Sequence, residues 1–535
     1  SSFGNVFSGV ASGTGGLTVA GGTETLSGAN TYTGVTTVAE GAGLNLPGSI
    51  AGDLTTAGTT SIAGGRVGGS TSNSGTLTAS NATLHDLANT AGTATLTNTT
   101  VGALTNADGA TLSVSGGSAT SAINAGTMSL SGGNTVSGDV TNTAGQLTLD
   151  GATVGGKLAA QGGSFTVGAN AASAGSLSGS ADGTLDGSLS LSKAADTYSG
   201  ILSGAGGLSV NGGSEVLSGD NTYTGTTTIA TGGTLQLGDG GTTGSISSSA
   251  AVHNDGQLIV KHSNGLTIAQ AIDGSGSFIQ AGTGTTTLSA ANTYTGVTTV
   301  AQGSGLNLPG SIAGDLTTAG TTTIAGGSVG GSTSNSGTLT ASNATLHDLS
   351  NTAGTATLTN IKASALTNAD GATLSMSGGS ATSATNAGTM SLSGGNSVSG
   401  DVTNTAGQLT LDGATVGGTL AAQGGSFTVG SNAATAGSLS GSADGTLDGS
   451  LSLSNAADTY SGILSGTGGL SVNGGTETLS GANTYTGVTT VAQGAGLNLP
   501  GSIAGDLTTA GATSISGGSV GGSTSNSGTL TASNA

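Results

Sequence analysis

The sequence predicts an all-β fold in which one strand-and-turn unit repeats and stacks, that is, a parallel β-solenoid. Two observations predict it: long internal repeats, and a shorter rhythm of asparagines inside them. The segment Asn30-Thr31-Tyr32-Thr33-Gly34 returns three times, with its asparagine at positions 221, 292 and 483. The intervals are 221−30 = 191, 292−221 = 71 and 483−292 = 191 residues. Such self-similarity indicates an architecture whose units mainly contact their neighbours.

The repeats divide the chain into long and short modules. We expect the end of one module at residues 1–34, a first long module at 35–225, a short module at 226–296, a second long module at 297–487 and the start of a third at 488–535. Both ends fall inside repeats, so we expect a fragment of a larger protein. A secretion signal or membrane anchor would then lie outside this chain.

Within the long modules, asparagines recur at steps of 16, 17, 18 and 18 residues, each followed by glycine and an x-apolar-x-apolar segment. They are Asn73, Asn89, Asn106, Asn124 and Asn142, repeated as Asn335, Asn351, Asn368, Asn386 and Asn404. Period-two alternation indicates strands, and Asn and Gly are expected to supply the turns because both tolerate left-handed backbone. A unit of about 17–18 residues buries its apolar side only by stacking, which predicts a single elongated rod.

In this rod, Leu, Val and Ile are expected to point inward and Thr and Ser outward. The asparagines are expected to form a ladder of amide hydrogen bonds along the stack. The alternative is an antiparallel β-sandwich or a string of small β-domains. That fold needs hairpins about every 8–12 residues and usually a larger aromatic core. Aromatic residues are only 2% of this chain, which favours the solenoid.

The charge and the absence of cysteine exclude several classes of partner and of chemistry. There are 25 acidic and 5 basic residues, a formal charge of −20, so the chain has no electrostatic footprint for nucleic acid or anionic lipid. It has no cysteine, which excludes disulfides, thiolate metal sites and thiol nucleophiles.

Three stretches carry a resemblance to a known family: Gly15–Leu46 with its later copies, Gly232–Ile246, and Gly274–Gly296. They resemble the passenger-associated repeats of bacterial autotransporter passenger domains. The resemblance implies a right-handed parallel β-helix that is secreted across the outer membrane and displayed at, or shed from, the cell surface. It also implies that the passenger-associated repeat serves secretion and folding, and that the rest of the rod serves adhesion or aggregation.

The aromatic residues of the repeated motif are interpreted as structural. Tyr32, Tyr223, Tyr294 and Tyr485 are large side chains that we expect to fill or cap widened turns, with the hydroxyl bonded at the rim. The alternative is an exposed platform on which a ligand stacks.

Catalytic patterns are present but weak. His85-Asp86 and its copy His347-Asp348 look like half of a catalytic triad, but adjacent residues alternate across a strand and are not expected to bond each other. Gly326–Gly330 matches the G-x-S-x-G elbow, a match expected by accident in a chain with 107 glycines. No basic residue keeps its identity between modules.

Metal ligation and ice binding are also weakly supported. Asp182 with Asp186, and their copies Asp444 and Asp448, are candidates for Ca²⁺, but the calcium-binding nonapeptide is absent. His253 and His262 are nine residues apart with no third ligand in view. Ice binding needs T-x-T on one face of many consecutive turns, whereas the outward pattern in the sequence varies between Thr, Ser, Asn and Ala. We expect no catalytic residue, cofactor or metal.

The function that follows is a non-enzymatic, structural and adhesive region of an extracellular bacterial protein. We expect it to associate with itself into fibres or biofilm and to contact surface glycans or host receptors. The alternatives are a carbohydrate-processing β-helix enzyme and a passive spacer for a binding tip outside the chain.

Overall fold

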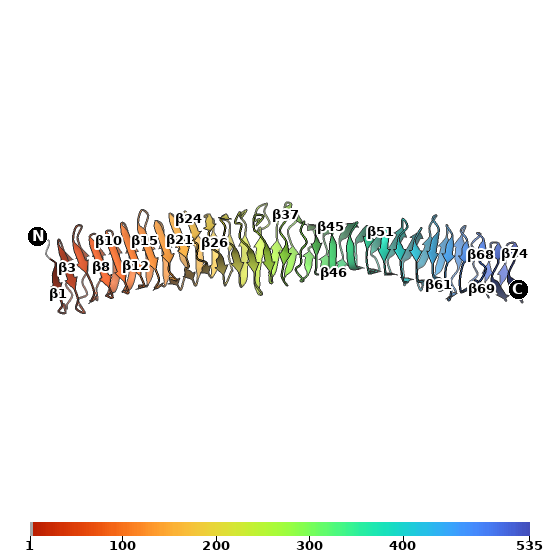
Figure 1. Ribbon diagram of the computed structural model, residues 1–535, viewed down its shortest axis with the longest axis horizontal. Coiled ribbons are helices and arrows are strands. Elements are labelled where there is room, and N and C mark those ends of the chain that lie inside the picture. The colour runs from red at the N-terminus through yellow and green to blue at the C-terminus, as the bar shows by residue number, and fades with distance from the viewer. Residues whose placement is uncertain (1–3) are drawn as a thin grey trace. The chain divides into compact units, whose positions relative to one another are not determined.

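The computed structural model describes residues 4–535, and the regular structure in these residues is all β-strand. The chain divides into two units, Ser1–Ser277 and Phe278–Ala535. Each unit is a parallel β-solenoid, elongated along its stacking axis, in which the chain coils and each strand pairs with the corresponding strand of the next turn (Figure 1). Residues 4–535 form about 29 turns. The prediction of an all-β parallel solenoid is confirmed, and the hand of the coil stays a prediction.

One face of the first unit is a 12-stranded parallel sheet with one strand from each turn. Its strands are β1 (Asn5–Phe7), β3 (Thr23–Leu26), β5 (Gly43–Asn45), β8 (Thr59–Ala63), β10 (Thr76–Ser80), β12 (Thr93–Thr97), β15 (Thr111–Ser115), β18 (Thr127–Ser131), β21 (Gln146–Asp150), β24 (Ser164–Val167), β27 (Gly183–Leu185) and β30 (Leu202–Ser203). Leu77 pairs with Ala94, Ala94 with Leu112, and Leu112 with Met128. These steps are 94−77 = 17, 112−94 = 18 and 128−112 = 16 residues, close to the predicted turn length.

A second face of the same unit carries the asparagines. Its strands β9 (Arg66–Asn73), β11 (Thr83–Asn89), β14 (Ala103–Asn106), β17 (Ser121–Asn124) and β20 (Val140–Asn142) each end at one of them. The five asparagines pair in register from turn to turn. They therefore form one column.

The second unit has the same plan in its long module. One face contains β45 (Thr321–Ala325), β47 (Thr338–Ser342), β49 (Thr355–Lys362), β51 (Thr373–Ala381), β53 (Thr389–Ser393), β56 (Gln408–Asp412) and β59 (Ser426–Val429). The asparagine-bearing face contains β46 (Ser328–Asn335), β48 (Thr345–Asn351), β50 (Ala365–Asn368), β52 (Ser383–Asn386) and β55 (Val402–Asn404).

The core is a narrow stack of small apolar side chains, as predicted. Leu77 and Ala79 on β10 are buried, as are Ala94 and Leu96 on β12, whereas Thr78 and Thr95 between them are exposed. The rule that Thr points outward is wrong at several turns. Thr56 and Thr60 are buried, and the Thr60 hydroxyl donates to Thr56 Oγ1 at 2.8 Å. Threonine has nearly the volume of valine, and at this pair the two hydroxyl groups bond each other inside the coil.

The turns are built differently from the sequence expectation. The column asparagines are strand residues, and the left-handed backbone lies instead at other asparagines, such as Asn81 (φ 50°) and Asn98 (φ 49°), and at glycines such as Gly92 and Gly145. Asparagine thus has two separate roles here. None of the described residues belongs to a helix that is long and apolar enough to cross a membrane.

Candidate functional site

The asparagine column is a continuous chain of side-chain hydrogen bonds. Asn73 Nδ2 donates to Asn89 Oδ1 at 2.7 Å, and Asn89 Nδ2 donates to Asn106 Oδ1 at 2.8 Å. Asn106 then donates to Asn124 at 2.9 Å, and Asn124 to Asn142 at 2.7 Å. All five side chains are buried. We call this set the asparagine ladder.

Every amide in the ladder points the same way along the chain. Each Nδ2 before that of Asn142 donates to the asparagine of the next turn, and also to a main-chain carbonyl, as Asn89 does to Thr111 O at 2.9 Å. The second unit repeats the arrangement, from Asn335 to Asn404, with distances of 2.7, 2.9, 2.9 and 2.7 Å. Amide dipoles aligned in one direction polarise one another, which strengthens the chain of bonds.

The motif tyrosines lie inside the coil rather than at its rim. The hydroxyl of Tyr32 is 2.6 Å from Thr36 Oγ1, and that of Tyr223 is 2.7 Å from Thr227 Oγ1. Tyr294 and Tyr485 bond Thr298 and Thr489 in the same way. These threonines are buried, so the hydroxyl partner is an interior group. Burial raises the pKa of Tyr485 to about 12.

Two further tyrosines escaped the sequence reasoning. Tyr198 and Tyr460 are fully buried and donate their hydroxyls to the carbonyls of Ala181 and Ala443, both at 2.7 Å. Their rings meet Phe165 and Phe427 edge to face, with centroids 6.2 and 6.3 Å apart. The signal was present, because both occur in an A-D-T-Y-S-G segment that is similar to N-T-Y-T-G.

Aspartates at the corners of the coil join one turn to the next. In each case Oδ1 accepts a main-chain N–H from the following turn, as Asp53 does from Ser70 at 2.8 Å and Asp86 from Ala103 at 2.7 Å. The other members of this set, which we call the corner carboxylates, include Asp139, Asp150, Asp182, Asp220, Asp255, Asp315, Asp348, Asp401, Asp412, Asp444 and Asp506. The excess of acidic residues therefore has a structural use.

The expectation that His85 and Asp86 do not bond is wrong. His85 Nδ1 is 2.9 Å from Asp86 Oδ2, and the copy at His347 and Asp348 has the same distance. The reason is a β-bulge: the register between β9 and β11 shifts between Leu84 and Asp86, which breaks the strict alternation of sides. Both side chains are well exposed, so the pair is a surface feature.

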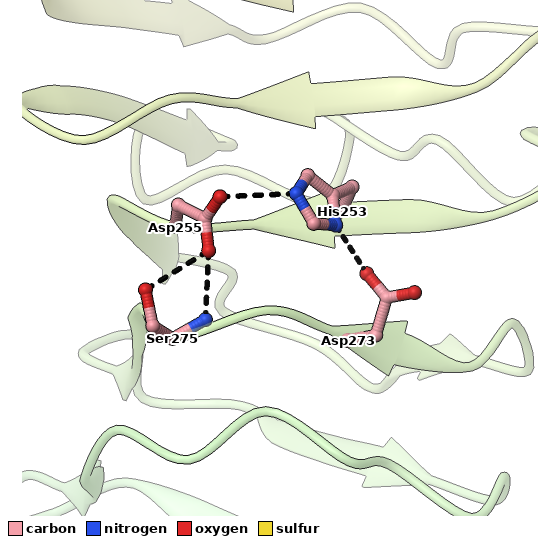
Figure 2. A network of polar contacts seen from close by, with 4 residues as sticks. All are labelled: His253, Asp255, Asp273 and Ser275. Atoms are coloured by element: carbon pink, nitrogen blue, oxygen red, sulfur yellow. Dashed lines mark hydrogen bonds and ion pairs between the residues drawn. The ribbon is translucent and has the colours of Figure 1, made fainter.

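A second histidine lies between two carboxylates (Figure 2). His253, on β35 (Val252–Asn254), has Nδ1 2.6 Å from Asp273 Oδ1 and Nε2 3.0 Å from Asp255 Oδ2. Asp255 Oδ1 in turn accepts from the main-chain N–H and the hydroxyl of Ser275, both at 2.9 Å. Because both ring nitrogens face acceptors, the arrangement favours the doubly protonated imidazolium.

This cluster is an ion-pair network and not a triad. The hydrogen bond to Asp273 raises the pKa of His253, and the main-chain and side-chain bonds from Ser275 lower the pKa of Asp255. The serine bonds the aspartate and not the histidine, so the geometry does not activate a nucleophile. No group of three His, Cys, Asp or Glu side chains in residues 4–535 is arranged to hold a metal ion.

The other sequence candidates have structural surroundings. Ser328 of the G-x-S-x-G match begins strand β46 and pairs with Ser311 and Thr345 of the neighbouring turns, so it is not on a strand-to-helix elbow. Asp182 and Asp444 are corner carboxylates. His262 is buried, and its Nε2 lies 3.2 Å from the Gly244 carbonyl oxygen.

Two buried glutamates were missed by the sequence reasoning. Glu215 on β32 (Gly213–Leu217) and Glu477 on β67 (Thr476–Leu479) are both 0% exposed. Burial raises the pKa of Glu215 to about 9 and that of Glu477 to about 8. Period two should have found them, because Glu215 alternates with the inward-pointing Leu217.

The outward hydroxyls are more regular than the sequence suggested. Thr59, Thr76, Thr93, Thr111 and Thr127 pair in register on consecutive turns and form one exposed column. Beside it, two residues further along each strand, run Ser61, Thr78, Thr95, Ser113 and Ser129. We call this surface the hydroxyl face. The sheet aligns residues that have unequal spacing in the sequence.

Comparison with known proteins shows that parts of this chain match a known repeat family. Four segments match the model of the passenger-associated-transport-repeat: residues 21–42, 211–237, 278–304 and 473–495. Each contains one of the motif tyrosines. Searches of curated proteins and of solved structures found no match to the chain.

The repeats and the coil together define a class: a β-solenoid built with passenger-associated-transport-repeats. Such a chain fits an autotransporter passenger domain, and the predicted resemblance is confirmed. The repeat family implies surface display or secretion.

Proposed function

We propose that this chain is a non-enzymatic shaft of a passenger associated with the Gram-negative outer membrane, and that it works by self-association and adhesion. The observation that carries the proposal is the hydroxyl face. Serines and threonines fill its columns on β10, β12, β15 and β18, and no charged residue interrupts them. The second unit has an equivalent exposed column of Thr321, Thr338, Thr355, Thr373 and Thr389.

The chemistry of this face suits contact between identical copies. A hydroxyl group both donates and accepts hydrogen bonds, so a face of hydroxyls is complementary to itself. Two chains that each carry a charge of −20 repel one another, and repulsion is weakest where neither presents a charge. The contact that we propose is many weak hydrogen bonds between stiff surfaces, with fibres or biofilm as the product.

The test is self-association of purified protein, measured by light scattering against concentration. Lysines on the hydroxyl face (T76K/T93K/T111K) should abolish concentration-dependent growth in particle size. The matched control places the same charge on a different face, at the exposed first residues of β13 (Thr100–Val101), β19 (Thr135–Val136) and β22 (Thr153–Val154) (T100K/T135K/T153K). Equal loss in both variants would show that net charge, and not this face, governs association.

Deleting residues 297–487 tests whether the chain is an adhesive shaft or a passive spacer. The deletion joins two equivalent positions of the repeat, so the coil should continue. An adhesive shaft should lose part of its clumping or binding to glycans and host cells. Full retention of both activities by the shortened chain would favour the spacer.

A further inference from the structure

The buried glutamates pair with apolar residues of the following turn. Glu215 pairs with Leu235 of β34 (Gly233–Leu237), and Glu477 pairs with Leu497 of β69 (Gly496–Leu499). In each, Oε2 accepts a bond of 3.4 Å from a serine hydroxyl, Ser176 or Ser438. In each, Oε1 is buried without a hydrogen-bond partner.

This environment rejects a carboxylate. A buried ionised carboxyl group needs a cation or several donors, and each site supplies only the serine hydroxyl and one main-chain N–H, from Leu177 or Leu439. The charged groups that face Glu215 are Asp196 and Lys157, which are paired with each other at 2.7 Å. The charged group that faces Glu477 is Asp458 alone. Neither set offers an unpaired cation.

The same position differs in the other two transport-repeat segments. Glu24 is part-exposed and lines a cavity of about 350 Å³ together with Phe7, Leu17 and Tyr32, so water reaches its surroundings. In the segment 278–304 the equivalent residue is Thr286, an uncharged buried residue whose hydroxyl donates to Gln280 Oε1 at 2.6 Å. Glu24 and Thr286 therefore serve as internal controls for the buried glutamates.

We propose that Glu215 and Glu477 are pH-sensitive locks in two of the four transport-repeat segments. Each turn is closed while its glutamate is a neutral acid, and it opens to admit water when that acid ionises. Opening is local, because each turn of a solenoid contacts mainly the turns beside it.

The direction of the pH effect follows from proton binding. Below about pH 4.5 both the closed and the open forms hold the proton, and pH has no effect through these groups. Above it the open form ionises while the closed form keeps its proton, so closure weakens as pH rises. Each glutamate changes the opening equilibrium about tenfold per pH unit, until the closed form also ionises. Because burial raises the pKa to about 9 for Glu215 and about 8 for Glu477, the loss should extend to pH 8–9.

Infrared spectroscopy tests the protonation state in the folded wild-type protein. The spectrum at pH 7 should contain the carbonyl stretch of a neutral carboxylic acid, which is distinct from the carboxylate bands. Subtracting the spectrum of E215Q/E477Q should isolate it, and E24Q should leave it unchanged. A wild-type spectrum at pH 7 with carboxylate bands only would overturn the proposal without any variant having to fold.

Hydrogen exchange between pH 5 and pH 9, corrected for the intrinsic rate, tests the opening. Peptides covering 213–217 and 476–479 should lose protection as pH rises, while the peptide covering 285–288, with Thr286, should not. In E215Q/E477Q the first two peptides should become as independent of pH as the third. Protection that falls equally in all three peptides, or that still falls in the glutamine variant, would refute a lock at these residues.

Discussion

At the scale of single residues, polar side chains inside the coil do most to specify the structure. Each inner asparagine of the ladder accepts a hydrogen bond from the previous turn and donates one to the next, and all of these side chains are buried. An unpaired polar group there is expensive, so each asparagine depends on both of its neighbours.

Replacing Asn106 with leucine should therefore cost more than the loss of one bond. The change removes Asn106 Oδ1, one of the two acceptors of Asn89 Nδ2, and it removes the donor to Asn124 Oδ1. We expect about 3 kcal/mol of destabilisation, measured by denaturant unfolding, because two buried groups lose a partner. Asn81→Gly is the control, since Asn81 is exposed and left-handed, and it should stay within about 0.5 kcal/mol.

The exposed His253 should titrate above its ordinary pKa of 6.5, because Asp273 and Asp255 stabilise the imidazolium. A group whose folded-state pKa is raised adds stability below pH 6.5, and that stability is lost as pH rises through the folded-state value. The effect on unfolding should be small because the side chain is 47% exposed. An NMR titration of the imidazole checks it. A midpoint at or below 6.5 in the wild type, or one unchanged in Asp273→Asn, would contradict the ion-pair network.

The sequence predicted some of the structurally important residues and missed others. The asparagines were found because a once-per-turn polar residue is visible as a period. The glutamates were overlooked, although their alternation with Leu217 and Leu479 places them inside. The His85–Asp86 contact had no sequence signal beyond the paired glycines Gly68 and Gly69, which lie opposite His85 in the bulge.

At the scale of the strand, main-chain pairing to both neighbours is the dominant interaction. Strand β12 pairs in register with β10 on one side and β15 on the other. Its main-chain N–H groups therefore depend on these two strands for their acceptors. The sequence located such strands well, because x-apolar-x-apolar after glycine is a strong local signal. It did not reveal which turns carry inward threonines, because Thr suits either face of a narrow coil.

Thr95→Pro should break the sheet at β12. Proline cannot donate to the ladder, and the expected cost is about 3 kcal/mol or more. Thr95→Val keeps the β-branched shape of this exposed residue and should be nearly neutral, which separates the effect on the main chain from that on the side chain. Circular dichroism and denaturant unfolding measure both variants. Equal stability of the two variants would mean that pairing at β12 contributes little.

At the scale of the whole molecule, a stack of nearest-neighbour contacts predicts local responses. Damage in one unit should not spread through the other, because stability is approximately the sum of turns and the interfaces between them. Hydrogen exchange of Asn106→Leu should therefore show lost protection around residues 89–124 and unchanged protection in the copy at 351–386. A uniform loss across both ladders would indicate a single cooperative transition instead.

The corner carboxylates have one more consequence. Each uses a single oxygen as a main-chain acceptor, and the amide oxygen of asparagine can accept the same bond. Exchanging these aspartates for asparagines should move the isoelectric point of 4.1 toward neutrality while the coil persists. The net charge of such a chain can therefore change, by evolution or by design, while its architecture stays the same. The charge would set how the molecule behaves in brine, mucus or a charged matrix.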